Sequence, residues 1–326
     1  MTILVFDLGG SLLRAGAVRG DDLVATARLA SDVVRGEGDF MPRLERAITD
    51  LAAQVLAGET PEAVSMAVPG PVHDGVVERL PSLVGPAYKG GVDFGALARR
   101  LWPNHPVFIC NDLTAAGHLY VSRGHRDFGV LTLGSGVGGK LFIDGKPLLG
   151  RLGFGGEIGH WRVPGAPLTA CDCGGRGHLS GLSSGRGAVR LAQWRAGEDP
   201  KGFRGSGAAV LCGGDAAALT PEQLVRAFHD GDPWAVASLE ASADYLGASL
   251  AALALAAGLE QFFLTGGFAV AAGEPFRAMV ATAAETYSWH GAGQDWDAAV
   301  RLAAAGEEPG LLGAAAYAKA MAVAPS

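Results

Sequence analysis

The stretch Leu133-Gly134-Ser135-Gly136-Val137-Gly138-Gly139-Lys140 is a glycine loop between two apolar runs. It fits the G-x-G-x-x-G pattern of dinucleotide sites and the G-x-x-x-x-G-K pattern of the P-loop, but both patterns need a helix after the loop. Here residues 141–146 predict a strand and a turn, and Leu141 cannot supply the hydroxyl that holds Mg²⁺ in a P-loop. A hairpin without a ligand would explain one or two glycines, but not four in six positions. We therefore predict a phosphate-binding hairpin.

Two further glycine turns follow apolar runs that read as strands. Asp7-Leu8-Gly9-Gly10-Ser11 places a carboxylate at a strand end, where it could reach a hydrated metal while backbone amides approach a phosphate. A simple turn aspartate is the alternative for Asp7. The third turn is Leu264-Thr265-Gly266-Gly267-Phe268. The first and second loops together predict a clamp for one polyphosphate, and the third turn adds another glycine turn of the same kind.

The composition favours a globular enzyme. The chain has 326 residues, of which 49% are hydrophobic and 18% charged, so it can bury a core and its length suggests two lobes. Its net charge of −7 without a basic tail argues against general binding of nucleic acid and of anionic membranes. The N-terminus opens into a strand without a signal peptide, and the four cysteines do not resemble a disulfide framework. We expect a cytoplasmic enzyme with a small-molecule substrate.

Hydrophobic patterning predicts strands that alternate with helices. Strands are expected at residues 2–7, 12–18, 64–68, 107–110, 129–133, 140–143 and 261–265. Helices are expected at 39–57, from about 113, within 231–258 and at about 310–322, and residues 150–187 are expected to be irregular. Residues 2–18 and 129–143 share a strand–glycine turn–strand pattern, which suggests two related lobes.

Seven motifs follow one another along the chain: Asp7-x-Gly9-Gly10-Ser11, Val68-Pro69-Gly70-Pro71-Val72, Asn111-Asp112, residues 133–139, Gly156-Glu157-Ile158-Gly159-His160, Cys171-x-Cys173-Gly174-Gly175-x-Gly177 and Gly266-Gly267. In this order and spacing the chain resembles the ROK family of sugar kinases over nearly its whole length. The resemblance implies the two-lobed α/β fold of the actin/hexokinase-like (ribonuclease H-like) class, with a cleft between the lobes. It implies an N-terminal lobe of residues 1–115, a C-terminal lobe of residues 116–326, and a last helix that can pack back on the N-terminal lobe.

The resemblance also implies ATP and Mg²⁺ as cofactors and a homodimer. Asp112 matches the general base that takes a proton from the acceptor hydroxyl, although Asn111-Asp112 alone would read as a helix cap. Asp7 matches the residue that reaches Mg²⁺ through water. The nucleotide-binding positions are Asp7, Gly9, Gly10, Ser11, Leu12, Gly134, Ser135, Gly136, Gly138, Gly266, Gly267 and Phe268. The substrate-binding positions are Gly70, Ser82, Asn111, Asp112, Glu157, His160 and Ser180.

A zinc site is implied near the substrate loop. His160 matches the histidine that binds both sugar and zinc, and Cys171 and Cys173 match two zinc cysteines. His178 stands where the family carries its third zinc cysteine. These four residues would form a closed Cys₂His₂ tetrahedron, and the zinc would be structural.

Several positions depart from the family pattern. Ser180 replaces a sugar-binding Glu, Ser82 replaces a sugar-binding Asn, Leu12 replaces a Lys, and Tyr120 replaces a Glu. Sites that bind a given hydroxyl discriminate strongly, so these changes predict an altered acceptor: a modified hexose, an amino sugar such as kanosamine, or a cyclitol. The main alternative is a non-catalytic sugar-sensing protein of the same fold, and a dinucleotide oxidoreductase comes third. The sugar, the phosphorylated hydroxyl and the choice between ATP and polyphosphate stay open.

Overall fold

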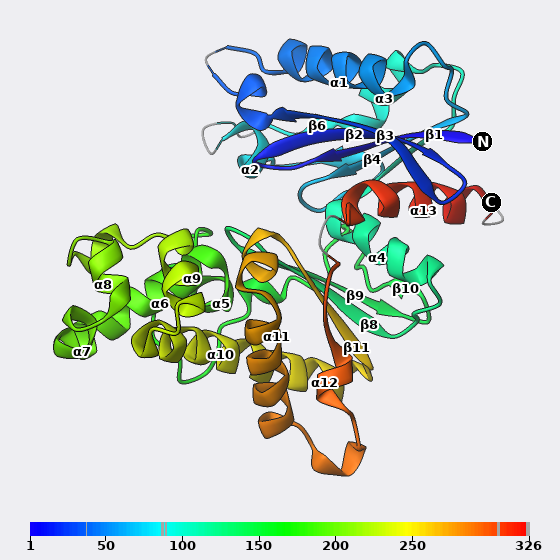
Figure 1. Ribbon diagram of the computed structural model, residues 1–326. Coiled ribbons are helices and arrows are strands. Elements are labelled where there is room, and N and C mark those ends of the chain that lie inside the picture. The colour runs from blue at the N-terminus through cyan, green and yellow to red at the C-terminus, as the bar shows by residue number, and fades with distance from the viewer. Residues whose placement is uncertain (37, 86–87, 89, 305–306, 324–326) are drawn as a thin grey trace. The chain divides into compact units, whose positions relative to one another are not determined.

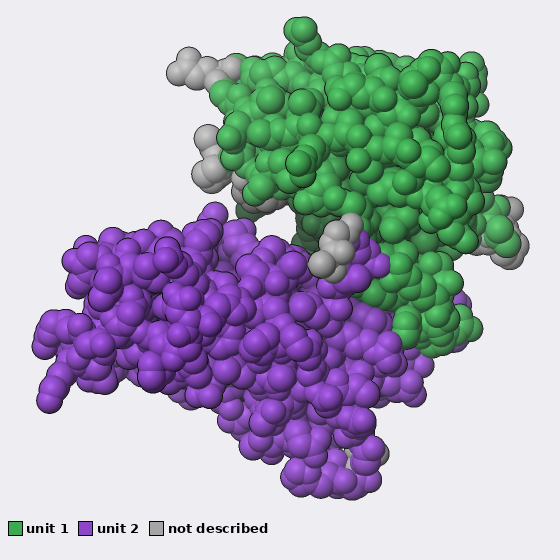
Figure 2. All heavy atoms as spheres, viewed as in Figure 1, with its two compact units in different colours: residues 1–126, 147–155, 308–326 green, residues 127–146, 156–307 purple. Residues whose placement is uncertain are grey.

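The computed structural model describes residues 1–36, 38–85, 88, 90–304 and 307–323, and the chain forms two compact units (Figure 2). Unit 1 comprises residues 1–126, 147–155 and 308–326, and unit 2 comprises residues 127–146 and 156–307. The division expected after residue 115 therefore differs from the observed one. The helix that begins at Asp112 stays whole in unit 1, and two later segments return to that unit.

Unit 1 is built on a five-stranded sheet in the order β3-β2-β1-β4-β7 (Figure 1). Its strands are β1 (Thr2–Leu8), β2 (Leu12–Arg19), β3 (Asp22–Ala30), β4 (Ala63–Val68) and β7 (Val107–Asn111). The first three strands are antiparallel, whereas β1, β4 and β7 run parallel to one another. All six residues of β4 are buried, as expected for a central strand that is covered on both faces. The three parallel strands therefore end at the same edge of the sheet.

Helices cover both faces of this sheet (Figure 1). One face carries α1 (Met41–Leu56) and α3 (Phe94–Leu101), and the other carries α4 (Asp112–Ser122) and α13 (Pro309–Val323). The buried hydroxyl of Ser65 in β4 donates to the Ala314 carbonyl at 2.8 Å, which fastens α13 to the sheet. The last helix thus belongs to unit 1. The short elements are η1 (Ser31–Val34), β5 (Val76–Val77), α2 (Pro81–Val84) and β6 (Val92–Asp93).

Unit 2 repeats this sheet order as β10-β9-β8-β11-β12. Its strands are β8 (Phe128–Leu133), β9 (Val137–Ile143), β10 (Lys146–Pro147), β11 (Gln261–Thr265) and β12 (Val300–Leu302). β8 and β9 pair antiparallel, while β8, β11 and β12 run parallel. The prediction of an α/β fold with two related lobes is therefore confirmed. β9 begins at Val137 rather than at Lys140, so the glycine loop is shorter than predicted.

Two long helices pack together in unit 2: α10 (Pro233–Ala257) and α11 (Gly267–Tyr287). The start of α10 follows from its sequence, because the Asp232 side chain accepts from the backbone of Trp234 and Ala235 and Pro233 takes the first helical position. The remaining elements are η2 (Ile158–His160), α5 (Ser180–Ser183), α6 (Gly185–Glu198), α7 (Pro200–Arg204), α8 (Gly207–Leu211), η3 (Ala216–Ala218), α9 (Pro221–His229), η4 (His290–Ala292) and α12 (Trp296–Ala299).

Among the described residues, none of the helices combines the length and the apolar character that crossing a membrane requires.

Candidate active site

The first glycine loop of unit 1 joins β1 to β2. The Gly9 amide donates to the Leu12 carbonyl at 2.9 Å and closes the turn. The Ser31 hydroxyl donates to the Gly9 carbonyl at 2.6 Å, and Arg35 donates to the Gly10 carbonyl. Ser11 is exposed, and its carbonyl accepts from the Ser31 amide. Ser31 and Arg35 therefore hold the loop by hydrogen bonds to its carbonyl groups.

Asp7 lies just before this loop in an ion pair that the sequence did not reveal. Arg14 Nη1 is 2.9 Å from Asp7 Oδ2 and 3.5 Å from Glu308 Oε2. Burial raises the pKa of Asp7, the Arg14 guanidinium lowers it, and the Glu308 carboxylate raises it again. Arg14 thus offsets the charge of a mostly buried carboxylate.

Asn111 and Asp112 stand where β7 ends and α4 begins. The Asn111 side chain accepts from the amides of Leu113 and Thr114 at 3.0 and 3.2 Å, so Asn111 is the helix cap. Its Nδ2 donates to the Gly70 carbonyl at 3.0 Å and to Asp112 Oδ1 at 2.8 Å. Asp112 therefore occupies the first helical position, with one carboxylate oxygen oriented by Asn111. Asp112 Oδ1 also accepts from the Leu113 amide at 2.8 Å, so both residues of the Asn111-Asp112 pair bind amides of the first turn of α4.

The ends of the three parallel strands of unit 1 gather the predicted residues of that unit. Asp7 is next to the last residue of β1, Gly70 follows β4, and Asn111 ends β7. Burial strongly raises the pKa of the Cys110 thiol in β7, and the carboxylates of Asp112 and Asp7 raise it further. Both negative charges therefore lie close to one thiol. The C-terminal edge of such a sheet is where α/β proteins bind ligands.

The second glycine loop, in unit 2, is fastened to the start of α6. The Gly185 amide donates to the Gly134 carbonyl at 2.8 Å, and the Ser184 hydroxyl lies 3.2 Å from the Ser135 carbonyl. The Ser180 hydroxyl accepts from the Val137 amide at 3.0 Å. Ser180, predicted as a substrate residue, therefore binds the end of the glycine loop through its hydroxyl. Gly138 lies within β9.

The third glycine turn joins β11 to the N-terminus of α11. Gly266 adopts a φ of 91°, and a Cβ there would lie 2.6 Å from the Thr132 hydroxyl, so only glycine fits. Gly267 is the first residue of α11, whose helical conformation is interrupted at Gly273 (φ 71°), so the turn leads into a short helical segment whose first backbone amides can face an anion. Phe268 is 6% exposed and packs against Phe276, so its side chain belongs to the core of unit 2.

Glu157 is the cap residue of η2 and forms an ion pair that the sequence did not suggest. Lys140 Nζ lies 2.8 Å from Glu157 Oε1. The Lys140 side chain is 1% exposed, whereas that of Glu157 is 40% exposed. The carboxylate thus has one oxygen tied to a buried ammonium and remains accessible from outside.

The four predicted zinc ligands come together in unit 2. The candidate ligand atoms of His160, Cys171, Cys173 and His178 all lie within 4.8 Å of one another. Cys173 Sγ is 3.3 Å from His178 Nδ1, and Cys171 Sγ is 4.0 Å from His160 Nδ1. Ligands at about 2.0–2.3 Å from a tetrahedral zinc are separated by similar distances. Two thiols and two imidazoles are also a donor set that zinc prefers, so the cluster fits this metal.

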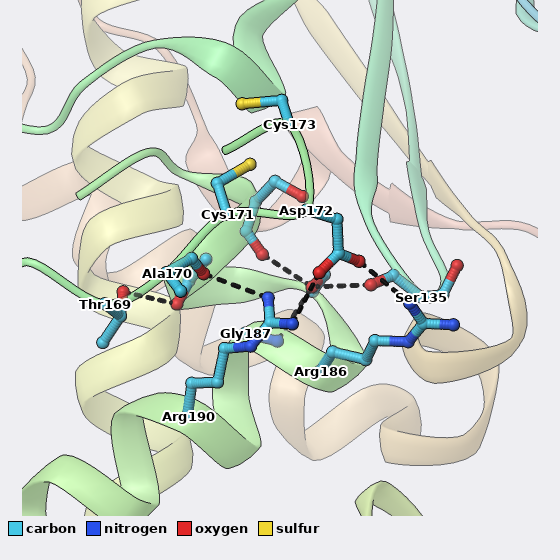
Figure 3. Close-up of polar contacts among 12 residues, drawn as sticks. Ser135, Thr169, Ala170, Cys171, Asp172, Cys173, Arg186, Gly187 and Arg190 are labelled. Carbon is cyan, nitrogen blue, oxygen red and sulfur yellow. Dashed lines mark hydrogen bonds and ion pairs between the residues drawn. The ribbon is translucent and has the colours of Figure 1, made fainter. Parts of the chain in front are cut away.

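The cysteine loop is anchored to α6 through the residue between the two cysteines (Figure 3). Asp172 accepts from Arg186 at 2.9 Å and from Arg190 at 2.5 Å, and the pKa of its carboxyl is lowered by these arginines against the effect of burial. The Thr169 hydroxyl donates to the Gly181 carbonyl at 2.7 Å. The start of α6 therefore connects the cysteine loop with the glycine loop of residues 134–136.

The structure thus assembles the predicted residues as two groups, one in each unit. Unit 1 holds Asp7, the loop of residues 9–12, Gly70, Asn111 and Asp112, and unit 2 holds the loops of residues 134–138 and 266–268 together with Glu157, the Cys/His cluster and Ser180. Ser82 lies in α2, and its side chain is outside the described part of the structure. The sequence did not point to Arg14, Asp172 or Lys140. Arg14 and Lys140 left a signal, as charged residues in apolar strands, whereas Asp172 did not.

Comparisons with known proteins agree with this arrangement. The profile of the ROK family matches residues 6–321. The chain is 35% identical over 291 residues to the C(7)-cyclitol 7-kinase of Streptomyces hygroscopicus subsp. jinggangensis (strain 5008), covering 84% of this chain and 81% of that protein. It is 30% identical over 271 residues to the kanosamine kinase of Amycolatopsis mediterranei (strain S699), covering 82% and 80% of the two chains.

Solved structures show the same fold. A ROK family glucokinase from Streptomyces griseus, in complex with glucose and AMPPNP, superposes with a TM-score of 0.77 at 28% identity and covers 98% of this chain and 100% of its own. A ROK family transcriptional regulator reaches a TM-score of 0.78 at 22% identity, which shows the fold alone. The fold is therefore the two-lobed actin/hexokinase-like fold that the sequence predicted. With a family match over nearly its whole length, this chain belongs to the ROK family.

Proposed function

We propose that the protein is an ATP- and Mg²⁺-dependent kinase that phosphorylates a hydroxyl group of a sugar-like polyol. The observation that carries this proposal is the position of Asp112, fixed by Asn111 at the C-terminal edge of the unit 1 sheet. Two relatives that share more than four-fifths of this chain are named as kinases, of a C(7)-cyclitol and of kanosamine.

Asp112 would act as the general base. A carboxylate within hydrogen-bond reach of a hydroxyl orients it and takes its proton as the new bond to phosphorus forms. Asn111 donates to Oδ1 of Asp112 at 2.8 Å, which fixes the direction of the carboxylate. The Gly70 carbonyl, which accepts from the same amide, would fix the adjoining backbone against the acceptor.

The glycine loops would hold the nucleotide. Gly9, Gly10 and Ser11 of unit 1, and residues 134–136 of unit 2, form short turns between strands in which backbone amides can approach phosphate oxygens. The start of α11 at Gly266 and Gly267 adds backbone amides that can face an anion. When bound, Mg²⁺ neutralises charge on the phosphates, and Asp7 is the carboxylate that would orient its water.

Glu157 and His160 would contact the acceptor, together with Asn111 and the backbone of Gly70. Both side chains belong to the short segment that leads into and forms η2, which the Cys/His cluster and the Asp172 ion pairs fix on one side. We propose that zinc bound by His160, Cys171, Cys173 and His178 is structural, since four protein ligands close a tetrahedral site. We also propose a homodimer, on family resemblance.

The proposal is tested by measuring ADP release from ATP in the presence of hexoses, amino sugars and C7-cyclitols, with each acceptor omitted in turn. We expect acceptor-dependent ADP release with at least one of these polyols. If calorimetry shows that several of them bind while none supports ADP release, the proposed kinase is wrong and a sugar-sensing protein of the same fold takes its place.

A further inference from the structure

Lys140 is a buried charge in an apolar strand. It lies in the middle of β9, followed by the buried Leu141 and Phe142, and its side chain is 1% exposed. Lysine is almost never buried to this extent unless its charge is compensated. Here the ammonium lies 2.8 Å from Glu157 Oε1. The pair therefore places a fixed positive charge directly behind the carboxylate of the proposed acceptor loop.

The backbone around this pair leaves little room for rearrangement. A Cβ on Gly156 would lie 2.9 Å from the Cα of Lys140, so the chain before Glu157 packs directly on β9. Gly156 also has a φ of 72°, which other residues rarely adopt. The backbone that carries Glu157 is thus held against β9, and the Lys140 ammonium binds one oxygen of the Glu157 carboxylate.

We propose that Lys140 determines the acceptor preference by offsetting the charge of Glu157, so that the site favours uncharged polyols over cationic amino sugars. The inference rests on the proposed function, in which Glu157 contacts the acceptor. A carboxylate whose charge is offset by a neighbouring ammonium still accepts hydrogen bonds from hydroxyl groups through its accessible oxygen. It no longer presents a net negative charge to an ammonium group.

Distance makes the effect of this charge substantial. A group that hydrogen-bonds to Glu157 at about 3 Å lies within about 6–8 Å of the Lys140 ammonium, because one carboxylate bridges the two. A like charge at that distance inside a protein changes affinity by about tenfold or more, even when it is partly screened. This repulsion reduces the attraction that Glu157 alone would exert on an ammonium, so the remaining attraction no longer offsets the cost of desolvating the ammonium, whereas a hydroxyl at the same position costs less to desolvate.

A second feature of unit 2 points the same way. The Ser180 side chain carries no charge, and its hydroxyl accepts from the Val137 amide. It therefore does not add a second carboxylate that could attract an ammonium. Of the candidate acceptor residues of unit 2, Glu157, His160 and Ser180, only Glu157 is a carboxylate, and Lys140 offsets it.

The experiment compares matched acceptors that differ by one amino group. Turnover and calorimetric binding are measured for glucose, glucosamine, kanosamine and a neutral C7-cyclitol, at a pH where the amines are protonated. The variants are Lys140→Met, which removes the charge, Lys140→Arg, which keeps it, and Lys201→Met, which removes an exposed lysine of α7. Circular dichroism and zinc content establish that each variant is folded.

We expect Lys140→Met to raise the ratio of kcat/KM for amino sugars to that for neutral acceptors by about tenfold or more. Lys140→Arg and Lys201→Met should leave this ratio within about twofold of the wild type. If Lys140 had a purely structural role, its loss would lower kcat/KM for amino sugars and for neutral acceptors alike. An unchanged ratio in folded Lys140→Met therefore overturns the inference. If Lys140→Met does not fold, a wild-type preference for the amino sugar of each matched pair overturns it equally. Failure of the wild type with every acceptor instead contradicts the proposed function.

Discussion

The two units of the protein share one sheet order but differ in what their loops carry. In unit 1 the strand ends present two carboxylates, Asp7 and Asp112. Arg14 forms an ion pair with Asp7, and Asn111 donates a hydrogen bond to Asp112. In unit 2 the two glycine turns, at residues 134–136 and at Gly266-Gly267, follow β8 and β11 without a carboxylate, and the acidic group, Glu157, lies on a long segment outside the sheet. The same topology thus presents carboxylates at strand ends in one unit and a carboxylate on a segment outside the sheet in the other.

The difference between the two units indicates which residues can be substituted without disturbing the sheets. A base must be held at a fixed point, and Asp112 is fixed by a strand end and a helix start. The segment of residues 156–184 has little regular structure and is held by side-chain clusters, so its residues can change the acceptor without disturbing the sheet. Glu157 and Ser180 of this segment are therefore positions where acceptor specificity would be altered, and Lys140 of β9 would act on it through Glu157.

The largest effect is expected when the carboxylate of Asp112 in unit 1 is replaced. Asp112→Asn keeps the shape of the side chain but removes its basicity, and we expect kcat to fall by about 10²–10⁴-fold. The measurement is acceptor-dependent ADP release, with zinc content and circular dichroism unchanged. Asp22→Asn, at an exposed position at the start of β3, is the matched control and should keep wild-type turnover. Full activity of Asp112→Asn would show that the base lies elsewhere.

The next effect tests the metal cluster of unit 2. His178→Ala removes one of four ligands, and we expect loss of bound zinc and a fall of about 10–100-fold in kcat/KM through loosening of the acceptor loop. Zinc is measured by mass spectrometry on the purified protein. His178→Cys should retain zinc because a thiolate also ligates it, and the exposed His290→Ala should change nothing. Retention of zinc by His178→Ala would contradict the four-ligand site.

A third effect concerns the turn before α11. Gly266→Ala would place a Cβ 2.6 Å from the Thr132 hydroxyl at a φ of 91°. We expect a loss of about 1–3 kcal/mol in the free energy of unfolding, together with a higher KM for ATP. Denaturant unfolding and initial-rate kinetics measure the two quantities. Gly197→Ala in α6, where a Cβ would meet no atom within 4 Å, is the control and should be neutral or slightly stabilising.

The smallest effect at neutral pH concerns the helical layer of unit 1. His118 in α4 is 4% exposed and packs edge-on against Tyr317 of α13, and burial lowers its pKa to about 4. The unfolded chain binds this proton below about pH 6.5, whereas the folded chain does so only near pH 4. The contribution of neutral His118 to the free energy of unfolding is therefore fully present above pH 6.5. It is lost as the pH falls towards 4, by about 1–3 kcal/mol.

His118→Phe keeps an aromatic ring against Tyr317 and removes the titration. Unfolding by denaturant between pH 7 and pH 4 should therefore show a shallower loss of stability for this variant than for the wild type. Parallel curves for the two proteins would mean that His118 does not titrate on unfolding in this range.

The sequence predicted those parts of the molecule that depend on local patterns. The apolar runs of β1 and β4 mark their strands because these central strands are buried on both faces, while β7 is apolar but mostly half-buried. β3 was missed because this edge strand alternates half-buried and exposed residues without a buried face. The helices between residues 185 and 211 were missed because glycines interrupt their periodicity, whereas α9 was missed although its nine residues contain no glycine and Thr220 begins a capping box.

The residues of the candidate site also divide into those that the sequence predicted and those that only the structure brings together. The Cys/His cluster was predicted from the resemblance to the ROK family, and the structure brings all four candidate ligands together. The Lys140–Glu157 pair spans 17 positions and depends on how residues 156–158 pack on β9, which no local pattern encodes. Asp7 and Arg14 face each other only through the antiparallel pairing of β1 and β2. Charges that meet across strands are therefore the part that required the structure.

The central claim is that unit 1 supplies the base for phosphoryl transfer to a polyol hydroxyl. The most direct measurement is phosphorus NMR of the products formed from ATP and a C7-cyclitol or hexose. The account predicts a phosphate monoester on the acceptor in equal amount to ADP with the wild type, and a loss of this signal with Asp112→Asn. Inorganic phosphate as the only product, or ester formation at the wild-type rate by Asp112→Asn, would contradict it.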